Sequence, residues 1–499
     1  MKYRFNVLII GGGVAGNAIA RELSRFRMTV ALLEKESDVG METSCRNSGV
    51  LHSGINYEAG TLRAKLSVSG NAMMDKLCSE LKVKMKRIGK LTTAIDENDL
   101  PGLKRLMEQG TANRVPDLVI LNNHEMQKIQ PGIEGIAAIW SPTSAIISPY
   151  GLTIALAENA HTNGVEYFLK SEVLTVKKDE SGKFTVTTSN GETFSADIII
   201  NAAGLSSCRI SGLAGVNEGN NGESLKIWPC RGEYFVLDNR LDGTLKTLVY
   251  PVPGAKDAGL GIHLTPTVDG NILIGPSAEY IPEETPEDYR VTAPVLEDLR
   301  REAHKLLPDI KMSDFIRNFA GNRPKLTPPA EGGNADFIIE ETKSLNGFIN
   351  LIGIESPGLT SAPAIAEKVR DIVSKHIPLE EKEKFLAECS GFAGHFSDLS
   401  KEEQERLIKL EPEYGEIICR CEKITKKEVR DAIENSLGAR TLASIKYRAR
   451  NGMGRCQGGF CMPRIVRILR DEYGFTPEDY VLREAGSNLF TGNVMKGKD

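Results

Sequence analysis

The sequence predicts a multidomain protein of the α/β and α+β classes, built on a Rossmann-like nucleotide-binding domain. Three observations predict this. A strand, a glycine turn and a helix open the chain, short strand signals recur between residues 211 and 330, and four cysteines form two close pairs after residue 412. The second observation indicates an inserted mixed antiparallel sheet, and the third a small helical C-terminal domain with a cysteine cluster. The 499 residues exceed one compact core, because domains usually contain about 100–200 residues.

The composition is that of an ordinary globular protein. Hydrophobic residues make up 40% and charged residues 26% of the chain, and the net charge of −5 leaves no basic footprint for nucleic acid. No run of about 18 apolar residues occurs, so no membrane span is expected, while peripheral membrane contact stays open. The short apolar run at residues 7–10 lacks a cleavage site, which predicts a first strand and a cytoplasmic protein.

The first motif is a nucleotide cradle. Residues 7–10 form a continuous apolar run, typical of a strand buried on both faces. Gly11, Gly13 and Gly16 then fit G-x-G-x-x-G, whose glycines allow the turn, the approach of a pyrophosphate and close packing of the next helix. The second strand ends in Glu34, whose carboxylate can accept hydrogen bonds from both ribose hydroxyls of an adenosine. The alternative is a glycine turn in a plain α/β protein.

Three later segments favour FAD over NAD as the dinucleotide. The polar, glycine-punctuated residues 41–60 lead into a helix and can run beside a pyrophosphate and a flavin. A further strand ends in Ala-Ala-Gly at residues 202–204. Near residue 350, a strand and a glycine turn lead into a helix that begins near Thr360, and its N-terminus is suited to face a flavin carbonyl or the ribityl chain.

This arrangement resembles the D-amino-acid-oxidase-like superfamily of FAD enzymes over about residues 1–375. Three stretches are similar to L-2-hydroxyglutarate dehydrogenases: RNSGVLHSGINYEAGTLRAKL, RGEYFVLD and GIHLTPTVDGNILIGPSAE. Two more resemble FAD-dependent glycerol-3-phosphate dehydrogenases: FAGNRPKL and SPGLTSAPAIAEK. The resemblance implies FAD as a cofactor. The residues expected to contact it are Gly11, Gly13, Val14, Ala15, Gly16, Glu34, Lys35, Thr43, Ser44, Asn47, Ser48, Gly49, Val173, Ala202, Ala203, Gly204, Gly353, Gly358, Leu359 and Thr360.

The substrate domain is expected to consist of two insertions, residues 85–145 and 211–330. The second insertion carries four strand signals, GEYFVLD, TLVYPV, GLGIHLTP and GNILIGP, which predict a mixed antiparallel sheet lying over the flavin. A hairpin turn is predicted near Asp269 and Gly270. The remaining predicted boundaries are a discontinuous FAD-binding domain at 1–84, 146–210 and 331–375, a linker or docking segment at 376–411, a cysteine domain at 412–475 and a tail at 476–499.

The suggested chemistry is oxidation of a small anionic secondary alcohol by hydride transfer to flavin N5. It needs a base for the hydroxyl proton and a cation for the anionic tail. The resemblance puts His52 near the isoalloxazine, and His263 lies on a predicted strand that can face the substrate; the alternative for each is a structural histidine. Arg323 matches the substrate-binding arginine of the glycerol-3-phosphate family, and a guanidinium holds phosphate or carboxylate at two points. Its alternative is a surface ion pair, and the weaker candidate Arg231 can instead orient a loop.

The two cysteine pairs predict a metal centre. Cys419 and Cys421 are separated in sequence from Cys456 and Cys461, and four thiolates brought together can hold a [2Fe–2S] cluster. Structural zinc is the main alternative, although zinc sites usually show C-x2-C pairs. The stretch is similar to the bacterioferritin-associated-ferredoxin-like [2Fe–2S] domain, which also occurs on the large subunit of anaerobic glycerol-3-phosphate dehydrogenases. The remaining five cysteines, including Cys389, are expected to be small buried side chains.

Three short helices are predicted around these cysteines. A capping box begins the first at Thr425, the stretch TLASIKYRA fits the second, and Pro463 suits the first turn of the third. The glycines of GMGRCQGGFC would let backbone N–H groups approach the sulfur atoms of a cluster.

Together these features predict an FAD-dependent dehydrogenase that oxidises sn-glycerol 3-phosphate to dihydroxyacetone phosphate. The glycerol-3-phosphate family often carries a lysine in GKLT, whereas this chain has PGLT with Gly358 and Leu359. That departure keeps a dicarboxylate open as the anion, and L-2-hydroxyglutarate is the alternative substrate. Oxidation of an amine or amino acid is also open, as is a role as a non-catalytic electron-relay subunit.

The cluster bears on the electron acceptor. A flavin takes two electrons from a substrate, and a [2Fe–2S] cluster carries one at a time, so the cluster would give the flavin an exit for single electrons. The expected acceptor is a partner subunit or a quinone-linked protein rather than O₂.

Overall fold

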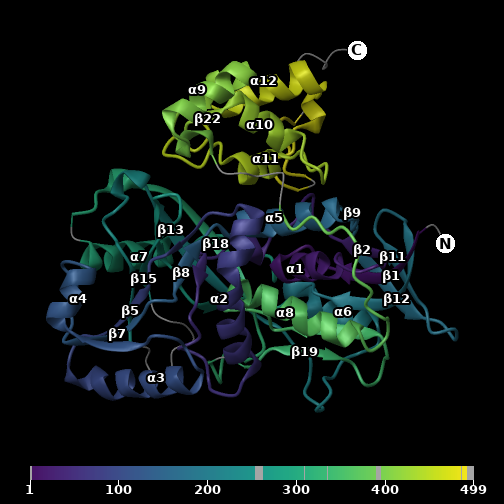
Figure 1. The fold of residues 1–499 in the computed structure, drawn as a ribbon, viewed down its shortest axis with the longest axis horizontal. Coiled ribbons are helices and arrows are strands. Elements are labelled where there is room, and N and C mark those ends of the chain that lie inside the picture. Colours follow the sequence, from purple (N-terminus) through teal and green to yellow (C-terminus); the bar gives the residue numbers. More distant parts are fainter. Residues whose placement is uncertain are drawn as a thin grey trace.

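The computed structural model describes residues 3–252, 262–307, 309–333, 335–388, 395–484 and 486–491. Cys389 lies outside the described residues. Two large sheets with their helices form the body, and a small helical lobe near the C-terminus lies against it (Figure 1). None of the helices that the described residues form has both the length and the apolarity to cross a membrane.

An eight-stranded sheet forms the nucleotide-binding half. Its first strand pairs in parallel with β2 on one side and with β12 on the other, and the end of β12 pairs in parallel with β20. The carboxyl ends of these four strands therefore meet at one edge, which brings Gly11, Glu34, Ala202 and Gly353 together. The strands are β1 (Tyr3–Ile10), β2 (Val30–Leu33), β9 (Glu166–Phe168), β10 (Val173–Lys178), β11 (Phe184–Thr188), β12 (Thr193–Asn201), β19 (Ile338–Glu341) and β20 (Phe348–Ile352).

Helices cover both faces of this sheet. On one face α1 packs against α5 and α8, and α2 packs against α8, over aliphatic side chains of β1, β2, β12 and β20. Gly16 allows the close approach of α1, because a Cβ there would lie 2.0 Å from the carbonyl oxygen of Gly11. The other face is covered by α6 and carries four buried phenylalanines of the sheet's own strands. These helices are α1 (Val14–Leu23), α2 (Leu62–Leu81), α5 (Pro149–Thr162), α6 (Ser207–Leu213) and α8 (Gly358–Val373).

The second large sheet has nine strands and contains both insertions. Its neighbours are antiparallel except β5 and β14, which run parallel, so the predicted mixed antiparallel sheet is confirmed. The predicted hairpin is also confirmed: β15 and β16 pair around a turn in which Gly270 has φ +85°. The strands are β5 (Lys90–Ala94), β6 (Val119–Asn122), β7 (Ala137–Ser141), β13 (Trp228–Leu237), β14 (Leu248–Pro251), β15 (His263–Pro266), β16 (Ile272–Gly275), β17 (Glu279–Tyr280) and β18 (Phe315–Lys325).

Smaller elements complete the body. β3, β8 and β4 form a separate three-stranded sheet, in that order. Its strands and the helices of the second half are β3 (Val50–Leu51), β4 (Met85–Arg87), β8 (Ala145–Ile147), α3 (Leu100–Ala112), α4 (Asn123–Ile129) and α7 (Ala293–Leu306).

The C-terminal lobe contains the three predicted helices in the predicted order. Thr425 accepts a hydrogen bond from Glu428 N and completes the capping box of the first. The lobe has its own core, and that core includes Tyr480 at 3% exposure, so the folded unit continues past the predicted boundary at residue 475. The elements are α9 (Lys401–Leu410), β21 (Ile417–Cys419), β22 (Ile424–Thr425), α10 (Lys426–Ile433), α11 (Leu442–Ala449) and α12 (Met462–Tyr473).

Two buried arginines at the end of α11 join this lobe to the body. Arg448 pairs with Asp38, and its Nε lies 2.9 Å from Glu158 Oε1 on α5. Arg450 pairs with Asp269, in the hairpin turn of the second sheet. In Figure 1, α11 is the lobe helix that faces α5. Since a buried charge is costly unless it is paired, these contacts favour a single docked position of the lobe.

Candidate functional site

A long cavity follows the edge where the parallel strands of the first sheet end. Its wide part has a volume of about 550 Å³, which is within the usual range for a small-molecule site. Its narrow part lies at the end of β2. Five residues line both parts, so the two are continuous: Gly13, Thr43, Ser44, Ala202 and Gly204.

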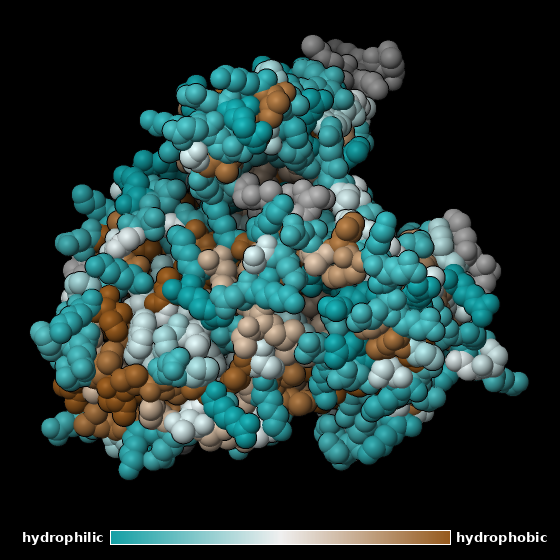
Figure 2. All heavy atoms as spheres, in the orientation of Figure 1, coloured by the Kyte–Doolittle hydropathy of each residue, from teal (hydrophilic) through white to brown (hydrophobic). Residues whose placement is uncertain are grey.

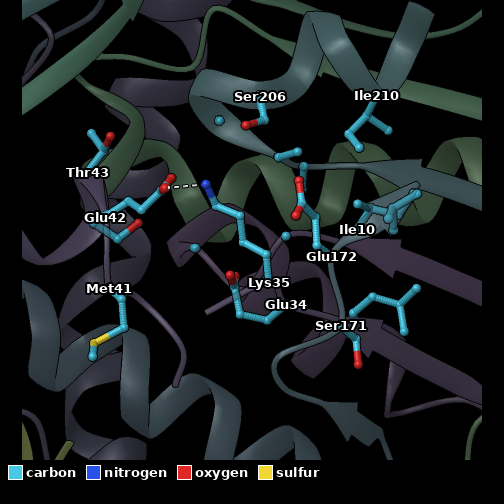
Figure 3. Close-up of a pocket in the computed structure, with 18 of the residues that line it drawn as sticks. Ile10, Glu34, Lys35, Met41, Glu42, Thr43, Ser171, Glu172, Ser206 and Ile210 are labelled. Carbon is cyan, nitrogen blue, oxygen red and sulfur yellow. Dashed lines mark ion pairs between the residues drawn. The ribbon is translucent and has the colours of Figure 1, made fainter. Parts of the chain in front are cut away.

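Glu34 marks the narrow end (Figure 3). Its Oε2 accepts a hydrogen bond from Gly12 N at 2.6 Å, and its Oε1 accepts one from Glu36 N at 2.9 Å. Burial raises the pKa of this carboxyl to about 7. The neighbouring Lys35 is held by Glu42, 2.8 Å from Nζ to Oε1. Glu34 is thus a buried acceptor at the position where a ribose diol would lie in a Rossmann-like site.

Replacing Glu34 with glutamine should weaken dinucleotide binding by about 10–100-fold, because hydrogen bonds to a charged group contribute about 1.5–3 kcal/mol. Fluorescence titration of the apoprotein with FAD measures the change in Kd. The substitution Glu36→Gln, two residues away, is the matched control and should leave Kd unchanged. An equal Kd for Glu34→Gln and the wild type would remove Glu34 from the binding site.

The middle of the cavity is a backbone cradle. Helix α1 begins there, with Gly13 as its N-cap and no acidic residue in its first turn. Ser44 Oγ accepts a hydrogen bond from Val14 N at 2.9 Å. A Cβ on Gly11 would lie 2.5 Å from the carbonyl oxygen of Ala202, so only glycine fits the φ of +110° and the close approach. A helix N-terminus with free N–H groups is suited to a diphosphate.

The wide part contains His52, which follows β3. Its Nε2 lies 3.3 Å from Ser356 Oγ, and Ser356 Oγ lies 3.2 Å from Tyr57 OH. Its backbone N–H donates to Thr360 Oγ1 at 3.0 Å. Burial, with Lys90 and His263 nearby, lowers the pKa of His52 to about 3. The imidazole is therefore neutral at pH 7 and can accept a proton.

Positive charge exceeds negative charge around this part of the cavity. Glu355 is shared by Arg63 and Lys325, each 3.4 Å away. Arg323, in contrast, has no carboxylate within ion-pair distance among the described residues; its Nη2 donates to Ser277 O at 3.2 Å, and its Nη1 lies 3.7 Å from Cys230 Sγ. The excess cation favours an anionic ligand.

A further buried cation, Lys90, lies behind the cavity wall. Lys90 is 1% exposed, and its Nζ lies 5.2 Å from the ring centre of Tyr250. That ring is 3.8 Å from the ring of His263, and both line the cavity. Burial lowers the pKa of Lys90 to about 8. The lysine adds to the positive potential of the site.

Most residues expected from the sequence line one part of the cavity. They are Gly11, Gly13, Val14, Ala15, Glu34, Lys35, Thr43, Ser44, Asn47, Ser48, His52, Val173, Ala202, Ala203, Gly204, His263, Arg323, Gly358 and Leu359. Four more support its walls. Gly16 packs α1 on β1, Gly49 and Gly353 have φ of +67° and +72°, and Thr360 holds the backbone of His52.

The structure does not bring Arg231 to the cavity. Its guanidinium lies 3.3 Å from Glu233, 2.6 Å from Glu279 and 3.3 Å from Asp288. Three carboxylates already neutralise this charge, so Arg231 does not serve as the substrate cation. It fastens β13 to β17 and to the segment after it.

The wide part also contains residues that the sequence did not single out. They include Tyr57, Arg63, Tyr234, Tyr250 and Ser356. Ser356 directly precedes the glycine turn of α8, and Tyr57 lies within the stretch 41–60. Their positions beside these motifs could have indicated that both residues line the cavity. Nothing local marks Tyr234 or Tyr250, which reach the cavity through strand pairing.

The four predicted cysteine ligands converge in the C-terminal lobe. Cys421 Sγ lies 3.4 Å from Cys456 Sγ. A hydrogen bond from Cys461 lowers the pKa of Cys419 to about 6, with help from the backbone N–H groups of Gly452 and Glu422. These thiols come from two loops on either side of α10 and α11.

The shape of the loops fits a cluster bound by four thiolates. A Cβ on Gly454 would lie 2.4 Å from the Cβ of Cys421, and Gly452 has φ +75° with its Cβ position 4.0 Å from Cys461 Sγ. The glycines therefore allow backbone N–H groups to approach the sulfur atoms, as an iron–sulfur site requires.

The comparison with known families agrees with both sites. Residues 6–372 match the family model of FAD dependent oxidoreductases. The chain belongs to this family, and it is an FAD-dependent oxidoreductase. Residues 417–471 match the BFD-like [2Fe-2S] binding domain. Its cofactors are thus FAD and a [2Fe–2S] cluster, and the match favours iron–sulfur over zinc in the cysteine loops.

Three known proteins show which members of the family the chain is similar to. The chain is 40% identical to a glycerol 3-phosphate dehydrogenase of Caloramator mitchellensis, over 98% of both chains. It is 33% identical to the mitochondrial L-2-hydroxyglutarate dehydrogenase of Arabidopsis thaliana, over 74% of this chain and 83% of the other. Among solved structures, the FAD-bound L-alpha-glycerophosphate oxidase of Mycoplasma pneumoniae has a TM-score of 0.70 and 30% identity, covering 77% of this chain and 98% of the other. The predicted fold class is confirmed.

Proposed function

We propose that the chain oxidises sn-glycerol 3-phosphate to dihydroxyacetone phosphate. The observation that carries the proposal is that one cavity contains a neutral His52 and an Arg323 with no carboxylate within ion-pair distance among the described residues. The names of the relatives favour glycerol 3-phosphate over L-2-hydroxyglutarate, because the match to a glycerol 3-phosphate dehydrogenase includes the C-terminal lobe.

The geometry of the cavity supports the following roles. The imidazole of His52 takes the proton of the substrate's C2 hydroxyl, and Ser356, which itself contacts Tyr57, orients the ring. Arg323 binds the phosphate, and Lys90 strengthens the positive field behind it. Bound FAD would supply the acceptor for the hydride that leaves C2. With a neutral turn at Gly358 and Leu359, no lysine from that turn adds to the phosphate site.

An anaerobic substrate panel tests the proposal. Glycerol 3-phosphate should bleach the flavin absorbance at about 450 nm, a general property of flavins, while L-2-hydroxyglutarate, glycine and L-proline should not. Bleaching by L-2-hydroxyglutarate alone would replace the proposed substrate. If no small molecule bleaches the flavin but a reduced redox protein does, the chain is an electron relay.

Replacing Arg323 with methionine should lower kcat/KM for glycerol 3-phosphate by about 10–100-fold, because a charge-assisted hydrogen bond contributes about 1.5–3 kcal/mol. Steady-state kinetics with a dye acceptor measures the loss. Arg323→Lys keeps the charge and should recover part of the rate. An unchanged kcat/KM in Arg323→Met would discard the assigned role.

We also propose that electrons leave the flavin through the [2Fe–2S] cluster. The cavity between the body and the lobe supports this route, because its lining runs from Arg46, Asn47 and Ser48, beside the wide cavity, to Gly452 and Gly458 in the cysteine loop. The proposed acceptor is then a one-electron carrier.

A further inference from the structure

An exposed aromatic ring lies beside the cysteine cluster. Phe460 directly precedes Cys461, and it is 69% exposed, although large aromatic side chains are usually buried. Arg420, between Cys419 and Cys421, is also exposed. Because the two cysteine pairs converge, the segments that carry Phe460 and Arg420 lie on the same end of the lobe. Figure 2 shows a largely hydrophilic surface on the visible side of the lobe.

The charge around this ring is positive and uncompensated. Lys423 and Arg464 are exposed, and Arg464 Nη1 donates to a backbone carbonyl of β21 at 2.6 Å. Among the described residues, Arg420, Lys423 and Arg464 have no carboxylate within ion-pair distance. The acidic residue between Arg420 and Lys423 is Glu422, whose side chain is 7% exposed and lies 2.8 Å from Arg450 Nη2.

The thiols themselves are nearest to solvent on one side. Cys419 and Cys461 are buried, whereas Cys421 and Cys456 are half-buried. A cluster bound by these four sulfur atoms would have one edge close to the surface. We define the cysteine-loop surface as Ile417, Arg420, Lys423, Phe460 and Arg464; Ile417 is 37% exposed.

We infer that the cysteine-loop surface docks an acidic one-electron carrier protein. Aromatic residues and arginine are enriched in protein–protein interfaces relative to the rest of the protein surface. Opposite charge steers such encounters, and weak redox encounters need only a small contact area. The inference rests on the proposed electron exit. Each docking transfers one electron from the reduced enzyme to the oxidised carrier, so two carriers are reduced for each substrate that loses two electrons and two protons.

Binding is tested first, without electron transfer. Fully oxidised holoenzyme is titrated with oxidised flavodoxin, an acidic carrier, by isothermal titration calorimetry at low salt. The double variant Arg420→Glu/Arg464→Glu should raise Kd by about tenfold or more, and added salt should weaken the wild-type complex. Phe460→Ala should also raise Kd. The matched controls are Leu410→Ala, with the same 69% exposure on α9, and Lys409→Glu beside it. Both controls should leave Kd unchanged.

Electron transfer is tested second, without substrate. Photoreduced holoenzyme is mixed with flavodoxin in a stopped-flow instrument, so the result does not depend on which substrate the enzyme takes. The double variant should slow flavodoxin reduction by about tenfold and should speed the reduction of cytochrome c, a basic carrier. If glycerol 3-phosphate fails to bleach the flavin but these shifts occur, the proposed substrate fails and the docking surface stands.

Three outcomes would overturn the inference. One is a Kd and a rate that are unchanged in both the double variant and Phe460→Ala. Another is an equal loss in the Leu410 and Lys409 controls. The third is loss of sedimentation with phosphatidylserine vesicles in the same variants while flavodoxin binding persists, which would assign the surface to a membrane.

Discussion

Replacing His52 with glutamine is expected to lower kcat for glycerol 3-phosphate by about 10²–10⁴-fold, the usual contribution of a general base. Ser356 Oγ contacts the imidazole, and the backbone N–H of His52 donates to Thr360 in α8, so the substitution removes the proton acceptor with little change of shape. Glutamine keeps a hydrogen-bonding side chain of similar size. Rapid anaerobic mixing with substrate, followed at the flavin absorbance, measures the loss directly.

His263→Gln is the control for that experiment. His263 packs on Tyr250 at 3.8 Å in the same cavity, so both substitutions perturb the wall while only one removes the proposed base. A larger loss in His263→Gln than in His52→Gln would exchange the two roles. Equal FAD affinity in both variants shows that the cavity is intact.

The pH dependence should show the same assignment. A base works in its neutral form, and burial holds the pKa of His52 at about 3, so kcat at saturating substrate should stay level on the acid side down to about pH 5. It should fall only as the pH approaches 3, because protonation then removes the base. An acid limb near pH 6.5 that disappears in His52→Gln would show that the imidazole is far more solvated than its burial indicates.

Replacing Cys461 with serine is expected to remove the [2Fe–2S] cluster entirely, since one of four thiolate ligands is lost. Iron content, visible absorbance above the flavin bands and the electron paramagnetic resonance signal of the reduced protein all report the loss. Glycerol 3-phosphate should still bleach the flavin, because the FAD cavity lies in the body of the protein.

Two further variants keep this prediction decisive. Cys461 is 1% exposed, so serine there can also disturb the lobe, whereas Cys456 is half-buried and Cys456→Ser tests ligation with less effect on packing. Cys208→Ser, in the body, is the matched control and should retain full iron. If both ligand variants retained full iron, the cluster could not be bound by these cysteine loops.

The features that sequence could predict depend on short-range rules. The glycine spacing from Gly11 to Gly16 and the position of Glu34 specify a strand, a tight turn, a helix and a second strand. The structure contains these elements in that order. The capping box at Thr425 and the turn at Gly270 are equally local. Each of these patterns is contained within a few residues, so it can be predicted without knowing which distant segments of the chain pack against it.

The features that sequence could not predict depend on distant pairing. Arg231 and Arg323 read alike as arginines beside strands, but β13 places the first among Glu233, Glu279 and Asp288. Lys90 resembles a surface lysine in sequence, and only the pairing of β5 with β14 and β7 buries it. The charge of a site is therefore known only after its carboxylates have been located in space.

The salt links of α11 have a mechanical consequence. Movement of the lobe would have to separate Arg448 from Asp38 and Glu158, and replacing Arg448 would leave both carboxylates buried without their partner, at a cost of about 3–5 kcal/mol. The lobe is thus held in one position against the body and does not move between a flavin-near and a carrier-near position. The rate of electron transfer from the flavin to the lobe should therefore not depend on solvent viscosity. Adding glycerol or sucrose should slow only the encounter of the lobe with an external carrier.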